Sequence, residues 1–148
     1  MSLLETINED IKTAMKAKDK ETLAILRMLK AALQNDQISK GNDLSEDEEL
    51  TVLSREMKQR RESLAEFKDA GREDLVDQTE AAIHTVEKYL PQQLSENELK
   101  AIIQDAATKV DAKSMKDFGK VMGVVMPLTK GKADGNEVNR LVKEQLNA

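Results

Sequence analysis

The sequence repeats a short motif that starts helices. Three times a serine is followed three residues later by a glutamate, at Ser2, Ser45 and Ser95, and Ser114 and Asp134 begin two variants of the motif. In this capping box, the serine side chain accepts from the amide of the third helical residue, and the glutamate accepts from the amide of the serine. An apolar pattern with the 3.6-residue helical period follows each motif. The two signals predict helices over residues 3–17, 20–38, 46–68, 73–89, 96–108, 115–125 and 135–146, with no strands.

Composition and helix stops agree with these starts. Aromatic residues are 2% of the chain, and most of the rest are strong helix formers such as Ala, Leu, Glu, Lys and Gln. Gly41 and Gly71 follow the second and third expected helices, and Pro127 with Gly131 is expected to break the chain before the last one. We therefore expect an all-α fold.

The stretch from Tyr89 to Pro91 is the expected junction between two subdomains, because proline ends the fourth helix and Ser95 caps the fifth. Residues 1–92 would form an N-terminal four-helix subdomain and residues 93–148 a C-terminal three-helix subdomain. The first carries 14 Lys/Arg against 20 Asp/Glu, a net charge of -6, and the second 9 against 8, a net charge of +1. Any anion-binding surface is therefore expected in the second subdomain.

The expected cellular compartment follows from features that the sequence lacks. It has no cysteine, so no disulfide calls for an oxidising environment. Glu5 stands where a secretory signal would be basic, and no apolar run approaches the roughly 20 residues of a membrane span. We expect a cytoplasmic protein that does not engage a membrane.

A search for catalytic groups finds little. The single histidine, His84, lies off the apolar stripe of its helix and lacks the partners that a metal site or a general base requires. The acidic run from Glu46 to Glu49 opens a helix, where carboxylates stabilise the free amides of the first turn. No serine lies in a nucleophile elbow, and no glycine-rich phosphate loop is present. We expect no catalytic residue, no cofactor and no metal.

Arg60 lies within the apolar stripe formed by Leu53, Met57, Leu64 and Phe67 on the third expected helix. An unpaired buried guanidinium is very costly, so Arg60 should extend its charge to solvent, pair with a carboxylate on another helix, or lie at an interface. A structural ion pair is the first interpretation, and a partner-binding role is the alternative.

The second basic constellation spans residues 119–143, which hold five basic residues against two acidic ones. Gly119 and Gly123 make a smooth strip where a backbone or a phosphate could approach closely. The loop around Gly131 brings two lysines to the N-terminus of the last helix, where free amides favour an anion. A solvated turn is the alternative. The candidate RNA-binding residues are Lys120, Lys130, Gly131, Lys132, Arg140 and Lys143.

This stretch resembles the tail domain of the B subunit of the glutamine-dependent tRNA amidotransferases. The tail pattern runs Gly-x-x-x-Gly-x-x-Met, then Thr-Lys-Gly-x-Ala, then Val-Asn. The whole chain resembles the YqeY family, through segments that include residues 27–35, 49–55 and 89–91. The tail pattern is matched in order and spacing by Gly119, Gly123, Met126, Thr129, Lys130, Gly131, Ala133, Val138 and Asn139.

The resemblance implies two helical subdomains, the second of the amidotransferase tail type, and tRNA as a partner that Lys130, Gly131 and Lys132 would contact. It also implies a carbon–nitrogen ligase label with glutamine as amide donor. We attribute that label to the shared domain, because the catalytic cradle of the B subunit is absent, and we do not expect the chain to catalyse alone. Pro127 replaces the usual lysine and Asp134-Gly135 the usual Asn-Pro, which brings a carboxylate to the expected phosphate site.

Three hypotheses follow. The first is a non-catalytic module that binds tRNA or another structured RNA through the C-terminal basic loop. The second is an accessory component of an amidation system, with amidotransferase or tRNA synthetase components as partners. The third is a protein-interaction module that docks a partner at Arg60.

Overall fold

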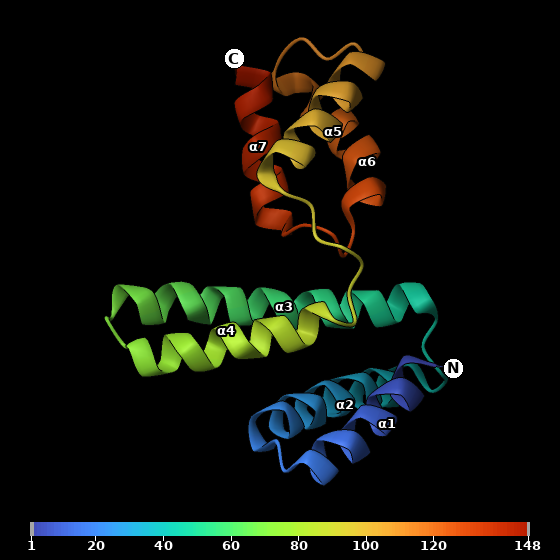
Figure 1. Cartoon of the computed structure of the whole chain (residues 1–148). Helices are drawn as coiled ribbons and strands as arrows, with labels where there is room; N and C mark the ends of the chain where they lie inside the picture. Colours follow the sequence, from blue (N-terminus) through green and yellow to red (C-terminus); the bar gives the residue numbers. More distant parts are fainter. Residues whose placement is uncertain (1, 148) are drawn as a thin grey trace. The chain divides into compact units, whose positions relative to one another are not determined.

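A computed structural model describes residues 2–147, and the chain is helical through most of that range (Figure 1). Within it there is no strand, in agreement with the expected all-α class. The elements are α1 (Leu3–Ala17), α2 (Lys20–Lys40), α3 (Glu46–Asp69), α4 (Glu73–Glu87), α5 (Glu96–Lys109), the 3-10 turn η1 (Met115–Asp117), α6 (Phe118–Thr129) and α7 (Gly135–Asn147).

The three Ser-to-Glu motifs form the capping boxes that the sequence predicts. The hydroxyl of Ser45 accepts from the amide of Glu48 at 3.2 Å, and the Glu48 carboxylate accepts from the Ser45 amide at 3.0 Å. Ser2 and Ser95 make the same reciprocal bonds at the starts of α1 and α5. At Ser114 the motif behaves differently: the hydroxyl accepts from the amide of Lys116, and a 3-10 turn forms first.

The prediction for the sixth helix was wrong at its C-terminal end. We expected a helix over residues 115–125 that Pro127 would stop, but α6 runs to Thr129 with Pro127 inside it. Proline removes one helical hydrogen bond, yet the amide of Lys130 still donates to the carbonyl of Met126 at 3.0 Å and closes the last turn. Gly131, at φ 74°, then ends the segment in the left-handed region that glycine adopts readily.

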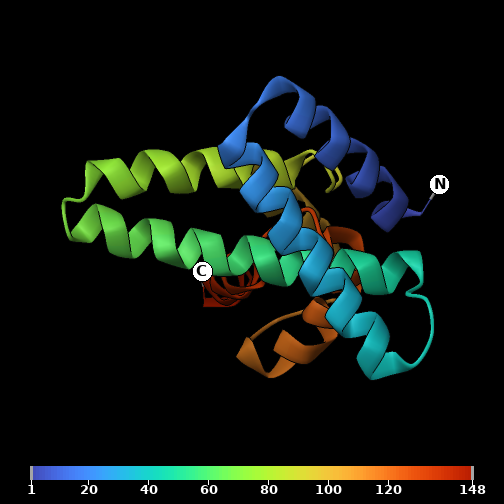
Figure 2. The same cartoon turned by 90° about the horizontal axis from the view of Figure 1, so that it is seen from below.

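The chain divides into two compact units, residues up to Pro91 and residues from Gln92 onward. In the first unit α1 and α2 form one hairpin and α3 and α4 another (Figures 1 and 2). The packed core of this unit consists of Ile7, Ala14, Leu26, Leu29, Leu33, Val52, Leu53, Met57 and Val86. The Tyr89 hydroxyl donates to the Asp10 carboxylate and ties the end of this unit to α1.

The second unit is a three-helix assembly of α5, α6 and α7 (Figure 1). Its core is separate from that of the first unit and comprises Leu99, Ile103, Ala106, Ala107, Val121, Val125, Val138, Leu141 and Val142. These residues recur every three or four positions on their helices, so each helix turns one apolar side inward. Lys120 on α6 and Arg140 and Lys143 on α7 are exposed, and Lys130 and Lys132 lie in the loop between these helices.

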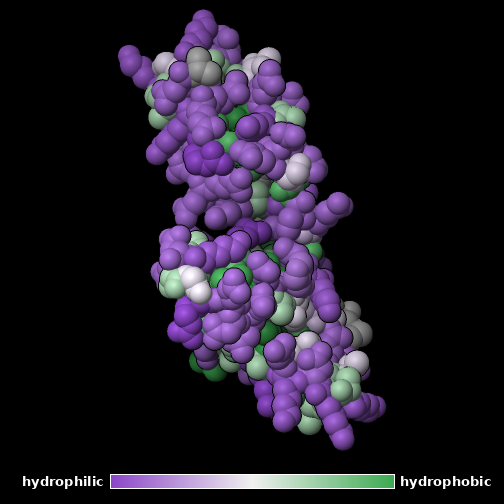
Figure 3. Space-filling model, turned by 60° about the vertical axis from the view of Figure 1, so that its left-hand side comes forward, coloured by the Kyte–Doolittle hydropathy of each residue, from purple (hydrophilic) through white to green (hydrophobic). Residues whose placement is uncertain are grey.

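The face of the molecule seen in Figure 3 is largely hydrophilic, with small hydrophobic areas between the polar side chains. Among residues 2–147, no helix combines the length and apolar character that crossing a membrane would require.

Candidate functional site

The basic loop lies between α6 and α7 and has a fixed local conformation. Lys130 ends α6, Gly131 follows with its positive φ, and the amide of Lys132 donates to the carbonyl of Thr129 at 2.8 Å. The Thr129 hydroxyl is itself buried and donates to the carbonyl of Val125 at 3.0 Å. The two lysines are therefore presented on an ordered turn, with Lys132 exposed.

A segment just after the junction holds this turn from its other side. The side-chain amide of Gln93 donates to the carbonyl of Gly131 at 2.7 Å, and the backbone amide of Leu94 donates to the carbonyl of Lys132 at 2.8 Å. Two acceptors of the loop are thus used within the unit. This role of Gln93 and Leu94 could not be predicted from the sequence, because no local pattern relates them to a loop about 38 residues away.

The start of α7 is occupied by the protein's own carboxylate. The side chain of Asp134 accepts from the amide of Asn136 at 3.2 Å, and the Asp134 carbonyl accepts from Val138 at 3.0 Å. The amide of Asn136 is one of the free donors at the helix start that would favour a bound anion. A phosphate at this helix end would therefore compete with the carboxylate of Asp134, a residue that departs from the tail pattern of the amidotransferase B subunit.

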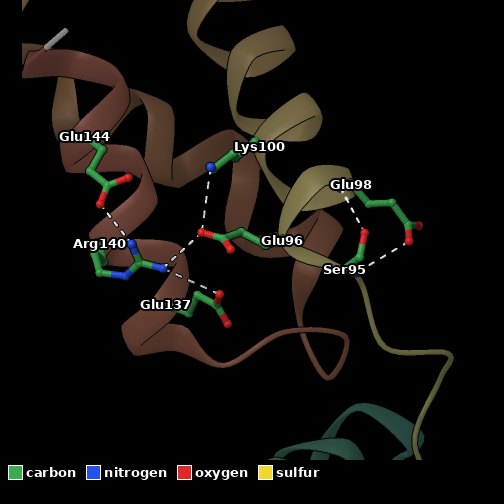
Figure 4. Close-up of polar contacts among 7 residues, drawn as sticks. All are labelled: Ser95, Glu96, Glu98, Lys100, Glu137, Arg140 and Glu144. Carbon is green, nitrogen blue, oxygen red and sulfur yellow. Dashed lines mark hydrogen bonds and ion pairs between the residues drawn. The ribbon is translucent and has the colours of Figure 1, made fainter.

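Arg140 is the centre of an exposed ion-pair network (Figure 4). Its guanidinium lies 2.8 Å from Glu144, 3.3 Å from Glu96 and 3.6 Å from Glu137. The hydrogen bonds to Glu96 and Glu144 raise the pKa of Arg140 above its ordinary value. Three carboxylates already surround this cation, so Arg140 contributes less to an anion-binding surface than its position in the sequence suggested.

The face of α6 contains the glycine strip. Gly119, Gly123 and Met126 recur at intervals of four and three residues, and all three are exposed. Apart from the neighbouring backbone of α6 itself, no atom lies within 4 Å of the place where a Cβ would stand on either glycine, so the helix is open to close approach there. Beside this strip, Lys120 has a 70% exposed side chain with its Nζ 3.8 Å from Asp117.

Lys143 on α7 reaches toward the same helix. Its ammonium lies 6.0 Å from the centroid of the Phe118 ring, at the start of α6. This is the outer limit of a cation–π contact, which leaves the ammonium free to move. The structure therefore places Lys120 and Gly119 along α6, with Lys143 near the start of that helix. The loop lysines lie beyond its end.

Arg60, the candidate in the first unit, is buried and paired. Its guanidinium donates to the carboxylate of Glu56 at 2.8 Å and to the carbonyl of the same residue at 3.0 Å. It also lies 3.6 Å from the sulfur of Met28 on α2. The ion pair forms within α3, one turn apart, rather than with another helix as the sequence analysis expected.

Arg60 borders a groove of about 820 Å³ between α2, α3 and α4. The volume lies within the range of ligand-binding clefts. Sequence patterns could not reveal this groove, because it depends on how α2 packs against the α3/α4 hairpin. Its lining includes Ile25 and Met28 from α2, Arg60, Ser63 and Phe67 from α3, and Thr79, Ala82, His84 and Thr85 from α4.

His84 lies on the rim of this groove, with its side chain 78% exposed and its Nδ1 3.6 Å from a Glu87 carboxylate oxygen. Across residues 2–147, no cluster of three or more His, Asp or Glu side chains has an arrangement suited to a metal ion. His84 has no second imidazole to work with, since it is the one histidine of the sequence.

These features define a class of small, two-unit helical proteins with an acidic first unit and a basic turn in the second. The chain belongs to the YqeY family, because the family model described as Yqey-like protein matches residues 4–146. This confirms the family resemblance drawn from the sequence.

Curated relatives share the name "Altered inheritance of mitochondria protein 41, mitochondrial". One from Pyrenophora tritici-repentis is 26% identical over 99% of this chain and 82% of its own length. One from Lachancea thermotolerans is 33% identical over 70% of this chain and 57% of its own length. A third, from Kluyveromyces lactis, is 34% identical over 58% of this chain. In the latter two, the matched region spans about half of the relative.

Proposed function

We propose that this protein is a non-catalytic module that binds tRNA or another structured RNA through its C-terminal unit. The observation that carries the proposal is the open backbone of α6 at Gly119 and Gly123, followed directly by the ordered lysine turn. A phosphate–sugar backbone can approach a helix closely only where side chains are absent. Lysines at the edges of such a strip would supply the phosphate contacts.

The electrostatics predict weak binding. Lys120, Lys132 and Lys143 are exposed, whereas Arg140 is surrounded by carboxylates and Asp134 stands at the start of α7. Two or three phosphate contacts would give a log–log salt slope near -0.9 for each contact on a duplex, and roughly micromolar affinity. Shape and single-stranded elements, rather than base sequence in a duplex, would provide selectivity.

Titration of fluorescently labelled tRNA tests the loop. A Lys130→Ala/Lys132→Ala variant should bind at least tenfold more weakly than the wild type at low salt, with a shallower salt slope. A Lys109→Ala/Lys113→Ala variant is the matched control, because it removes the same charge from the same unit. Equal binding by the loop variant and the wild type would refute the assignment, as would equal losses in both variants.

A second titration tests the glycine strip. Replacing Gly123 by leucine fills open space, so the variant should fold normally and gain helix propensity of up to about 1 kcal/mol. Binding of tRNA should nevertheless weaken severalfold, because the side chain would hold the RNA backbone away from α6. Leucine at exposed Ala101 on α5 is the control for added apolar surface.

The groove beside Arg60 favours a second candidate function, a protein-interaction module. The groove joins apolar side chains to a buried guanidinium, which suits an apolar segment that carries a hydrogen-bond acceptor. Capture of cellular proteins on the wild type and on Arg60→Leu tests it. Loss of a specific partner from the variant, with the fold intact by circular dichroism, supports docking; unchanged capture contradicts it.

The remaining proposals concern a role in a larger enzyme system and the cellular location. The accessory role in a carbon–nitrogen ligase system predicts that amidotransferase or tRNA synthetase components co-purify with the protein, and their absence from a cross-linked purification would count against it. For location we propose the cytoplasm. The cysteine-free sequence is compatible with any reducing compartment, and the names of the relatives place those proteins in mitochondria. Fractionation of cells that express the tagged protein decides between the two compartments.

A further inference from the structure

The groove beside Arg60 lies where α2 crosses the hairpin of α3 and α4. In Figure 2 the end of this hairpin that carries the turn between α3 and α4 extends beyond α2. The lining comes from the first half of α2 and from the neighbouring parts of α3 and α4. A site of this volume with a mainly apolar lining suits a small molecule with an apolar body. The apolar lining residues are Ala24, Ile25, Met28, Phe67, Ala81 and Ala82.

One buried donor of this groove has a weak partner. Nη1 of Arg60 is well satisfied, because it donates to the carboxylate of Glu56 at 2.8 Å and to the Glu56 carbonyl at 3.0 Å. Nη2 instead lies 3.6 Å from the thioether sulfur of Met28, and a thioether is a weak acceptor. Hydrogen bonds from a charged group to oxygen are among the strongest in proteins, so an oxygen acceptor would improve on the sulfur.

Met28 can make room for such an acceptor. Arg60 and Met28 both line the groove, and Met28 is 51% exposed. The unbranched methionine side chain has three rotatable bonds and adapts readily to a change in its surroundings. An oxygen atom that entered beside Met28 could therefore replace the sulfur and accept from Nη2 of Arg60, while Glu56 remains bonded to Nη1.

The other buried polar residues of the groove, Thr79 and Thr85, do not offer donors. The hydroxyl of Thr79 donates to the carbonyl of Leu75 at 2.7 Å, and that of Thr85 donates to the carbonyl of Ala81 at 3.2 Å. Both hydroxyl hydrogens are thus used within α4. Among the three buried polar residues of the lining, Arg60 is the one that has N–H groups for a ligand.

The charges around the groove cancel. Lys20 and Glu21 line it at the start of α2, and Glu56 neutralises Arg60. The remaining ionisable lining residue, His84, is counted as neutral in the formal charge at pH 7. A carboxylate or phosphate would bring an unbalanced negative charge beside a pair that is already neutral, which costs free energy in a partly buried site. An uncharged acceptor avoids this cost.

We propose that the groove binds an uncharged acyl compound, an amide or an ester, whose carbonyl oxygen accepts from Nη2 of Arg60. Its alkyl chain would lie along α3 toward Phe67. The rise from Arg60 to Phe67 is roughly 10 Å, so the groove covers a chain of medium length. This ligand is a small molecule, in contrast to the protein segment considered above for the same groove.

Titration with octanamide, followed by nuclear magnetic resonance of the methionine methyl groups, tests the site. The methyl signal of Met28 should shift at roughly sub-millimolar octanamide, whereas that of Met126, 42% exposed on α6, should not. Hexanamide should bind about fifteenfold more weakly, because each buried CH₂ group contributes roughly fourfold. Octanoate has the same chain length and a negative charge, and it should bind at least tenfold more weakly than octanamide.

Two variants and a control locate the ligand. Ala24→Phe fills the groove and should weaken octanamide binding more than tenfold. Ala31→Phe is the matched control, because Ala31 is exposed on the same helix and lies outside the lining. The double variant Glu56→Leu/Arg60→Leu removes the donor together with its partner. It should bind octanamide about tenfold more weakly, the low end for a hydrogen bond to a charged group, with its fold checked by circular dichroism.

Four results would overturn the proposal. Equal shifts of Met28 and Met126 would indicate unspecific adsorption of the alkyl chain. Octanoate that binds as tightly as octanamide would indicate an anion site, and equal binding by Ala24→Phe and Ala31→Phe would place the ligand elsewhere. An unshifted Met28, combined with loss of a cellular protein partner in Arg60→Leu, would assign the groove to protein docking. None of these measurements involves RNA, so this proposal and RNA binding can fail separately.

Discussion

An arginine of each unit, Arg60 in the first and Arg140 in the second, forms ion pairs in very different surroundings. Arg60 has a side chain only 9% exposed and a single carboxylate partner, Glu56, which is 13% exposed. Arg140 is 52% exposed and has three carboxylates within 4 Å. The exposed arginine therefore has more carboxylate partners than the buried one, although an unpaired charge costs more free energy when it is buried.

The difference shows what a count of ion pairs leaves out. Water screens the charges around Arg140, and exposed pairs contribute between 0 and about 1 kcal/mol each. The side chains of Arg60 and Glu56 are largely buried, so removal of one partner leaves the other charge buried and unpaired. The exposed cluster mainly sets local charge, whereas the buried pair is coupled to the packing of α2, α3 and α4.

The largest expected effect is the loss of Arg60. Arg60→Ala should lower the free energy of unfolding by about 3 kcal/mol, because the largely buried carboxylate of Glu56 would lose its partner. Arg140→Ala should lower it by less than about 1 kcal/mol. Urea denaturation followed by far-ultraviolet circular dichroism measures both. Equal losses for the two variants would show that burial does not separate the clusters.

Replacing both members of the buried pair sharpens the comparison. Arg60→Leu with Glu56→Leu should recover most of the stability lost in Arg60→Ala and end within about 1 kcal/mol of the wild type, since apolar side chains avoid the desolvation penalty. The same denaturation experiment measures it. If the double variant is as unstable as the single one, the specific hydrogen bonds of Arg60 matter more than the removal of its charge.

Salt should affect the two clusters differently. Raising the salt concentration from about 0.1 M to 1 M shortens the Debye length from roughly 10 Å to 3 Å. The small stability difference between the wild type and Arg140→Ala should therefore vanish at high salt, while the difference for Arg60→Ala should persist. A salt-independent Arg140 effect would indicate that packing of its side chain, rather than charge, is responsible.

The smallest effect concerns an exposed carboxylate in the first unit. The hydrogen bond from Lys40, followed by those from Ser45, lowers the pKa of Glu48 to about 2 from an ordinary value of 4.5. A depressed pKa stabilises the fold above about pH 4.5, and this contribution is lost as the pH falls toward 2. Nuclear magnetic resonance titration should show the pKa of Glu48 rising in a Lys40→Met variant, and an unchanged value would contradict the assigned cause.

Local signals predicted the helices well because they act within one turn. Ser45 and Glu48 are three residues apart, so their capping hydrogen bonds do not depend on the rest of the fold. Gly41 ends α2 through its own left-handed conformation, at φ 80°. Pro127 misled the prediction because α6 continues past it to Thr129, where the amide of Lys130 closes the last turn on Met126. A strong local preference is therefore a reliable guide to starts and a weaker one to stops.

The candidate site was harder to predict because it depends on contacts between helices. The position of Arg60 within the apolar stripe identified it as unusual. It did not reveal that Glu56 on the same helix forms an ion pair with Arg60, or that a groove lies beside it. In the second unit, Arg140 was grouped with the lysines because Glu96 is 44 residues away in sequence. Sequence patterns located the basic loop but not the carboxylates that partly neutralise its surroundings.

Pro127 has a chemical consequence beyond its effect on helix length. It has no amide hydrogen, so the helical bond that would end on the carbonyl of Gly123 is missing, and Gly123 lies in the open strip of α6. The pyrrolidine ring of the exposed Pro127 takes the place of that donor, because a proline inside a helix lies against the carbonyl four residues earlier. The open strip of α6 therefore continues from Gly123 onto an apolar ring and not onto a hydrogen-bonding surface.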